Sequence, residues 1–327
     1  MLEFSTKANT LKSLQGKSKK FNILHQVSFT VQELENEPEK LREQILREFS
    51  GKKLIVRSSA LSEDSAQESL AGKFLSVTNI NPENIIDAAR QVKASFSDTN
   101  PKNQILVQPM LDHIAMSGVL FTLDPNTGGN YFVINYDISG SADSVTSGEG
   151  KSLSACYIFH GKKCGDARLD YLCDAAQELM DLFEKKNIDI EFAFTSDDKL
   201  YLLQARPLVL KNSYYADFSD QKISLKNAYN YIAGNMCPRP YLKGKRTIYG
   251  VMPDWNPAEM IGIRPKPLAS TLYRRLITDG TWAYQRDEYG YRNLRSFPLM
   301  VEFCGLPYID IRVKMYAMEG VSNKELY

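Results

Sequence analysis

Residues 188–207 read IDIEFAFTSDDKLYLLQARP, and this stretch decides the fold. Two runs of alternating apolar and polar residues flank a short polar segment, a pattern typical of a β-hairpin. Because side chains alternate across a strand, Asp189 and Glu191 share one side of the first strand, and Gln204 and Arg206 share one side of the second. If the hairpin pairs these sides, two carboxylates, an amide and a guanidinium meet at one place.

This set of side chains suits a metal ion bound to phosphate. Mg²⁺ takes hard oxygen ligands, usually one or two protein carboxylates together with phosphate oxygens. Arginine binds a phosphate group through two parallel N–H donors. The same spacing also fits a surface hairpin with an ordinary ion pair, so the pattern alone leaves both interpretations open.

The stretch resembles the D-I-E-F … L-x-x-L-Q-x-R segment in the nucleotide-binding domain of pyruvate phosphate dikinase and phosphoenolpyruvate synthase. The resemblance implies that Glu191 and Gln204 hold Mg²⁺ on the ATP phosphates. It also implies that Arg206 contacts a phosphate and that Asp189 lies in the same nucleotide site.

A second resemblance surrounds Arg57, in the segment LIVRSSALSEDSAQESLAGKF. The segment begins as a buried strand, and it is similar to V-R-S-S-A-x-x-E-D-x-x-x-x-S-x-A-G in phosphoenolpyruvate synthase and rifampin phosphotransferase. This implies that Arg57 binds ATP phosphates and that Ser69 and Gly72 belong to a lid of small residues over them. Without the resemblance, Arg57 could equally pair with Glu63 or Asp64.

Four further residues are candidates through the same family resemblance. Ser5 or Thr6 is expected to cap a short helix, and Lys7 matches a lysine that reaches the nucleotide phosphates. Gln108 and Met110 resemble the V-Q-x-M hinge, whose main chain reads the adenine edge, although Met110 could also be a core residue. The segment SGVLFTLDPNTG resembles S-G-V-x-F-T-x-D-P-x-T-G, which implies that Thr122 lies near the triphosphate.

Composition and charge narrow the function classes. The chain has 327 residues, enough for two or three domains, and a net charge of +1, which gives no support for binding nucleic acid or an anionic membrane. No apolar run reaches the length of a transmembrane helix, and the first residues do not form a signal peptide. The five cysteines and three histidines lack metal-ligand spacing, so reduced thiols and a cytoplasmic location are expected.

The motifs together predict an α+β fold. Residues 1–210 are expected to form an ATP-grasp nucleotide-binding domain of two lobes, and residues 211–327 the beginning of a substrate-binding domain. A P-loop fold is excluded because the chain lacks G-x-x-x-x-G-K-[ST]. In the second part, aromatic residues alternate with arginines between 282 and 295. This alternation fits either RNA stacking or ordinary core packing, and the neutral charge favours the core.

The second part also resembles a phosphoenolpyruvate-synthase-like branch that includes the L-glutamine kinase of bacterial capsule phosphoramidate synthesis. The stretches NPAEMIG (256–262) and YGYRNLRS (289–296) carry this resemblance. It implies an AMP-forming, ATP-dependent phosphotransferase whose β-phosphoryl group passes through a histidine to a small acceptor such as L-glutamine. No G-x-x-[ST]-H motif occurs, so the phosphohistidine domain is expected to lie beyond this chain.

Three other functions fit the same residues. One is a module that binds Mg·ATP without catalysis. The second is an ATP-grasp ligase that forms an acyl phosphate and ADP. The third is a phosphoenolpyruvate synthase-like enzyme that acts on pyruvate.

Overall fold

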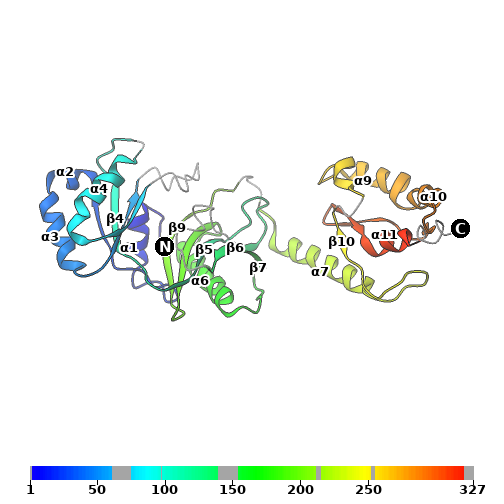
Figure 1. Cartoon of the computed structure of the whole chain (residues 1–327), viewed down its shortest axis with the longest axis horizontal. Coiled ribbons are helices and arrows are strands. Elements are labelled where there is room, and N and C mark those ends of the chain that lie inside the picture. The colour runs from blue at the N-terminus through cyan, green and yellow to red at the C-terminus, as the bar shows by residue number, and fades with distance from the viewer. Residues whose placement is uncertain are drawn as a thin grey trace. The chain divides into compact units, whose positions relative to one another are not determined.

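A computed structural model describes residues 2–60, 75–96, 98–138, 154–210, 215–251 and 255–319. The chain forms two units, residues 1–216 and residues 217–327. The sequence predicts a domain boundary between residues 210 and 211, six residues before this division. The first unit contains two lobes, each built on its own antiparallel sheet (Figure 1).

The first lobe has a four-stranded sheet in the order β1-β4-β2-β3, with antiparallel neighbours throughout. Helices α2, α3 and α4 lie on one face of it and close a core of aliphatic and phenylalanine side chains (Figure 1). The strands are β1 (Val27–Thr30), β2 (Leu54–Ser59), β3 (Ser76–Ile80) and β4 (Gln104–Pro109). The helices are α2 (Val31–Asn36), α3 (Pro38–Glu48), the 3-10 turn η1 (Pro82–Asn84) and α4 (Ile85–Ala94).

One difference from the sequence prediction lies in this lobe. The spacing of apolar residues predicts a single helix over residues 32–50, but two helices form, separated at Glu37. Glu37 has φ −134° and ψ 47°, outside the helical region. The residue before a proline is disfavoured in the helical conformation, so Pro38 ends the first helix and begins the second.

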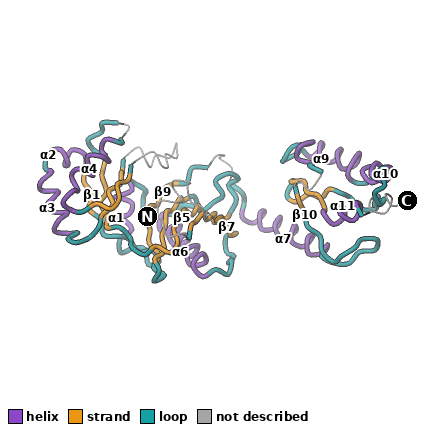
Figure 2. Tube along the Cα trace, in the orientation of Figure 1, coloured by secondary structure: helices purple, strands orange, loops and turns teal. Residues whose placement is uncertain are grey.

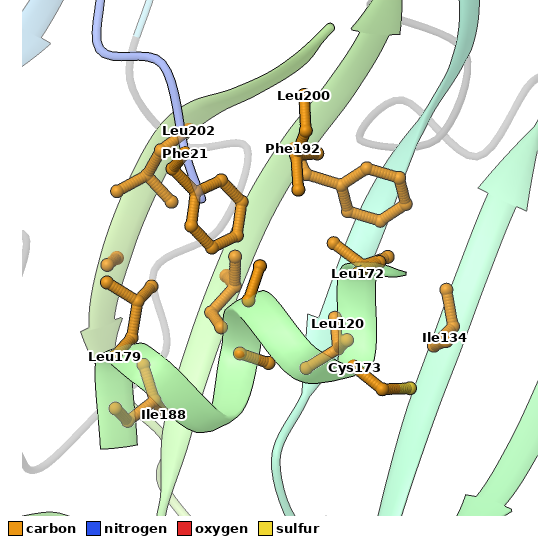
Figure 3. Close-up of a cluster of buried hydrophobic side chains, with 14 of the residues drawn as sticks. Phe21, Leu120, Ile134, Leu172, Cys173, Leu179, Ile188, Phe192, Leu200 and Leu202 are labelled. Atoms are coloured by element: carbon orange, nitrogen blue, oxygen red, sulfur yellow. The ribbon is translucent and has the colours of Figure 1, made fainter. Parts of the chain in front are cut away.

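The second lobe has a five-stranded sheet in the order β7-β6-β5-β8-β9. Strands β5, β7 and β9 of this sheet are labelled in Figure 2. Its strands are β5 (Ile114–Phe121), β6 (Tyr131–Asp137), β7 (Ser154–Phe159), β8 (Ile188–Thr195) and β9 (Leu200–Pro207). Helix α6 (Ala167–Phe183) covers one face, with Leu172 and Leu179 packed against strand residues such as Ile188 and Phe192 (Figure 3). Helix α1 (Lys7–Leu14) adds Ala8, Leu11 and Leu14 to the same core.

The predicted hairpin is confirmed as β8 and β9. Asp189 pairs with Arg206, and Glu191 pairs with Gln204. The register then shifts, because Phe192 pairs with Leu202 and leaves Leu203 as an extra residue, a β-bulge.

The second unit is a smaller α+β body with its own core. Its sheet has the order β10-β12-β11, built from β10 (Tyr249–Gly250), β11 (Met300–Phe303) and β12 (Leu306–Asp310). Trp282 and several aliphatic side chains lie in the core, but Tyr284 and Tyr289 are 53% and 67% exposed, so core packing describes only part of the aromatic cluster. The helices are α7 (Phe218–Asn235), α8 (Pro257–Ile261), α9 (Pro267–Tyr273), the π-helical turn η2 (Arg274–Thr278), α10 (Thr281–Glu288) and α11 (Ile311–Met318).

The α+β class is therefore confirmed, and the two lobes of the first unit agree with the ATP-grasp arrangement expected from the sequence. Within the described part of the chain, none of the helices combines the length and the apolar character needed to span a bilayer.

Candidate functional site

An ion pair between Arg57 and Glu191 joins the two lobes. Arg57 lies on β2 of the first lobe, Glu191 lies on β8 of the second, and Arg57 Nη2 is 2.9 Å from Glu191 Oε2. Both side chains are largely buried, with 14% and 19% of their area exposed. The expectation from sequence was that Arg57 binds phosphate or pairs with Glu63 or Asp64, which lie outside the described residues. Glu191 as its partner was not predicted.

The β-bulge at Leu203 builds the second contact of Arg57. The Leu203 carbonyl accepts a hydrogen bond from Arg57 Nη1 at 3.1 Å. The bulge also reverses which residues of β9 face the core, because Leu200 and Leu202 lie in the core before it and Ala205 lies there after it. Gln204 and Arg206 are thereby turned to the same face as Glu191.

Asp189 and Arg206 form a second buried ion pair on this face. Arg206 Nε and Nη2 each lie 2.8 Å from Asp189 Oδ2. Only 12% of the Arg206 side chain and 9% of the Asp189 side chain are exposed. Arg206 is thus held in one orientation. Gln204, two residues before it on β9, is 3% exposed.

The pKa values of the Glu191 and Asp189 carboxyl groups are shifted in opposite directions. Burial alone would raise the pKa of Glu191, but the charges of Arg57 and Lys7, the Arg57 hydrogen bond and the charge of Arg206 outweigh it and lower that pKa. Burial raises the pKa of Asp189 and the charge of Glu191 adds to this, although Arg206 opposes the shift. The centre therefore holds Glu191 ionised among three cationic side chains, an environment that favours anions.

Helix α1 brings Lys7 to this centre. Thr6 caps the helix, as expected, by accepting a hydrogen bond from the Asn9 amide at 3.4 Å. Two contacts with the first lobe fix this end: Thr6 Oγ1 donates to Gln104 Oε1 at 2.6 Å, and the Ala8 amide donates to Ser59 Oγ at 2.9 Å. Lys7 is the first helical residue and is 5% exposed, and its charge helps to lower the pKa of Glu191.

Gln108 lies on the same sheet face as Arg57, because Arg57 pairs with Leu106 and Gln108 is two residues further along β4. Its residue is 1% exposed, and its Nε2 lies 3.4 Å from Gln26 Oε1. Gln26 in turn donates to the Ala8 carbonyl of α1 at 2.7 Å. Sequence reasoning missed Gln26, since an isolated glutamine in a loop carries no pattern.

Met110 begins the connection between the sheets of the two lobes, which runs from the end of β4 at Pro109 to the start of β5 at Ile114. The Met110 amide donates to the Lys53 carbonyl at 2.8 Å, and its sulfur accepts from the Asn79 amide at 3.0 Å. Met110 therefore lies between the two sheets, and both its hinge role and a role in adenine recognition stay predictions.

Thr122 has a structural role that the sequence did not predict. Its residue is completely buried, its Oγ1 donates to the Lys186 carbonyl at 2.7 Å, and it accepts from the Ile188 amide at 2.6 Å. These bonds join the end of β5 to the start of β8. A contact with the triphosphate stays a prediction, as do the lid roles of Ser69 and Gly72, which lie outside the described residues.

The side chains of the centre fit a magnesium ion whose remaining ligands are phosphate oxygens. Glu191 and Gln204 present a carboxylate and an amide from paired positions of β8 and β9. Among the described residues, no group of three or more His, Cys, Asp or Glu side chains could hold a metal ion. Two protein oxygens completed by phosphate is the coordination that Mg²⁺ prefers. Arg57 Nε adds a buried donor that has no hydrogen-bond partner in the described part of the chain.

Comparison with known families points to the same nucleotide. Residues 4–149 match the family described as the pyruvate phosphate dikinase, AMP/ATP-binding domain. The match includes Lys7, Arg57, Gln108, Met110 and Thr122, and it ends before the β8–β9 hairpin. ATP binding is therefore supported for this chain. No curated protein is significantly similar to it in sequence.

Solved structures give weaker likenesses. The D-alanine-D-alanine ligase from Helicobacter pylori shares 17% identity and a TM-score of 0.38, covering 66% of this chain and 58% of that one. The ligase of the same name from Coxiella burnetii shares 10% identity and a TM-score of 0.39, covering 69% and 61%. An L-amino acid ligase from Bacillus licheniformis shares 16% identity and a TM-score of 0.36, covering 71% and 46%. With TM-scores this low, the likenesses say nothing about the function of this chain. The chain spans only about half to three fifths of the length of these ligases.

Proposed function

We propose that the chain binds Mg·ATP between the lobes of its first unit and acts as the nucleotide-binding part of an ATP-dependent phosphotransferase. The observation that carries the proposal is the Arg57–Glu191 pair, which joins the two sheets beside Lys7 and Arg206. Cationic side chains held by buried partners can meet phosphate charge with little reorganisation. The AMP/ATP-binding family match over residues 4–149 supports the same nucleotide.

Each residue has a distinct part in this proposal. Arg57, Arg206 and Lys7 bind the phosphate oxygens and orient the triphosphate. Enzymes catalyse phosphoryl transfer mainly by such positioning and by stabilising the phosphate charge. Glu191 and Gln204 would hold Mg²⁺, which neutralises phosphate charge when bound. Asp189 fixes the Arg206 guanidinium, because Asp189 Oδ2 contacts both Nε and Nη2 of Arg206.

The finer proposal is a dikinase-type reaction. ATP would yield AMP and phosphate, with the β-phosphoryl group passing to a histidine of a further domain and then to a small acceptor. The resemblance of residues 256–262 and 289–296 to the L-glutamine kinase branch suggests the L-glutamine amide as that acceptor. A module that binds Mg·ATP without catalysis is the second candidate, because the family match covers an AMP/ATP-binding domain alone.

A ³¹P NMR time course of the chain with Mg·ATP, with and without L-glutamine, tests these alternatives beside a thermal-shift titration with ATP. AMP, phosphate and a phosphoramidate signal would show that this chain carries out the dikinase reaction without a further domain, whereas ADP would indicate a ligase. Stabilisation by ATP that stays intact would support the binding module. If ATP does not raise the melting temperature at all, the proposed site is wrong.

A further inference from the structure

Helix α1 makes contacts with both lobes of the first unit. Its apolar side chains, Ala8, Leu11 and Leu14, lie in the core of the second lobe. The first turn of the same helix bonds instead to strands β2 and β4 of the first lobe. The helix therefore connects the two lobes at the end that carries Lys7.

Two paired residues of the first sheet make these bonds. Ser59 ends β2, and it pairs with Gln104, which begins β4. Ser59 Oγ accepts a hydrogen bond from the Ala8 amide at 2.9 Å, and Gln104 Oε1 accepts one from Thr6 Oγ1 at 2.6 Å. The residues on both sides of Lys7 are thus bonded to adjacent positions of one sheet.

Ser59 completes the capping of α1 from another part of the chain. The amides in the first turn of a helix have no acceptor within the helix, so side chains usually satisfy them. Thr6 accepts from the Asn9 amide, and Ser59, which is completely buried, accepts from the Ala8 amide. An alanine at position 59 would remove this acceptor from a buried amide.

The Ala8 carbonyl also contacts the first lobe. Gln26, the residue before β1, donates to it from Nε2 at 2.7 Å. Gln26 Oε1 accepts in turn from Gln108 Nε2 of β4 at 3.4 Å. Side chains of the first lobe therefore bind both main-chain polar groups of the residue that follows Lys7.

These bonds place Lys7 relative to Arg57. Arg57 lies two residues before Ser59 on β2, so the two side chains are on the same face of the sheet. The strand that carries Arg57 therefore also holds the helical turn that carries Lys7, a residue that is 5% exposed. The two cations are 50 positions apart in the chain, and the bonds of this turn set their relative position.

We propose that Ser59 and Gln104 are positioning residues that hold Lys7 in register with Arg57, so that both cations bind the same phosphate chain. This role rests on the proposed binding of Mg·ATP. Both side chains are uncharged and act on the nucleotide only through α1. Without either bond, the ammonium group of Lys7 would sample more positions, and phosphate binding would have to order it again.

Isothermal titration of the full chain with Mg·ATP tests these roles. Ser59→Ala and Gln104→Leu should each weaken binding by about fivefold, the effect of one lost hydrogen bond. In a Lys7→Ala background the same changes should cause no further loss, because no ammonium group is left to position. The matched controls are Ser13→Ala, which removes a bond within α1, and Gln44→Leu, which removes one within α3, and both should bind ATP like the wild type.

Three results would overturn the proposal. If the wild type binds ATP and both variants bind it equally well, the positioning role is wrong and the nucleotide site stands. If the loss is the same with and without Lys7, the two residues support the fold rather than Lys7. If the wild type binds no ATP, the proposed function fails and the positioning role fails with it. Urea denaturation shows whether each variant is folded, and the partly buried Gln104 supplies the test if Ser59→Ala unfolds.

Discussion

Arg57 and Glu191 stand 134 positions apart in the chain, yet their side chains form an ion pair of 2.9 Å between the sheets of two lobes. The same guanidinium also binds the Leu203 carbonyl at 3.1 Å, so one side chain contacts both strands of the hairpin. A nucleotide phosphate that enters this centre would meet a cation that is already oriented.

Replacing Arg57 tests whether this centre binds ATP. Arg57→Ala should weaken ATP binding by about 10- to 100-fold, because hydrogen bonds to charged groups contribute about 1.5–3 kcal/mol. Isothermal titration with Mg·ATP measures the change. The control is Arg90→Ala, an exposed arginine on α4 of the same lobe that pairs with Asp87. Equal affinities for the two variants would remove Arg57 from the site.

Replacing Glu191 tests the magnesium assignment. Glu191→Gln keeps the size of the side chain but removes the charge, so ATP binding should require a higher magnesium concentration and turnover should fall sharply. A magnesium titration at fixed ATP measures this dependence. Glu178→Gln on α6, whose carboxylate binds the segment around Ser18, is the matched control. Activity and magnesium dependence equal to those of the wild type would sink the assignment of Glu191.

Asp189 should contribute to stability through Arg206. Asp189→Asn leaves the buried Arg206 charge without its carboxylate, and breaking a buried ion pair costs about 3 kcal/mol of unfolding free energy. The desolvation that raises the pKa of Asp189 offsets part of this cost, because the neutral side chain is easier to bury. The exposed pair of Asp197 and Lys199 in the turn of the same hairpin supplies the control, and Asp197→Asn should change stability little. Urea denaturation of both variants measures the difference. Similar midpoints would show that the buried pair is not stabilising.

The pKa of Glu191 predicts a pH dependence of stability. Because that pKa is lowered in the folded protein, the carboxylate contributes its stabilisation above the ordinary value of 4.5 and loses it as the pH falls through the lowered value. The difference in unfolding free energy between the wild type and Glu191→Gln should therefore be constant near neutrality and shrink below pH 4.5. Denaturant titrations across this range test the sign. A difference that grows on acidification would contradict it.

Thr122 should act on the fold more than on the nucleotide. Thr122→Val removes the hydroxyl that joins β5 to β8 and should lower the unfolding free energy by about 1–3 kcal/mol while ATP affinity changes little. Thr127→Val, at an exposed turn position that bonds Asp124, is the control. If ATP affinity falls and stability does not, the phosphate contact predicted from the sequence is right and the structural role is wrong.

Local patterns in the sequence were enough to predict the hairpin and the faces of its strands. The alternation in residues 188–207 places Asp189 with Glu191 and Gln204 with Arg206, and the structure pairs these residues across the two strands. Alternation and turn composition depend only on neighbours in the chain, so they can be read without a fold. The helix cap at Thr6 was predictable for the same reason.

Contacts between distant segments were decided only by the tertiary structure. The sequence offered Arg57 two nearby acidic residues, which lie outside the described part of the chain, and sheet pairing and lobe packing bring Glu191 to it. The bulge at Leu203 has only a weak signal, the two adjacent apolar residues Leu202 and Leu203, yet it turns Gln204 and Arg206 away from the core. Register across strands and packing between lobes arise from long-range burial, which local spacing does not encode.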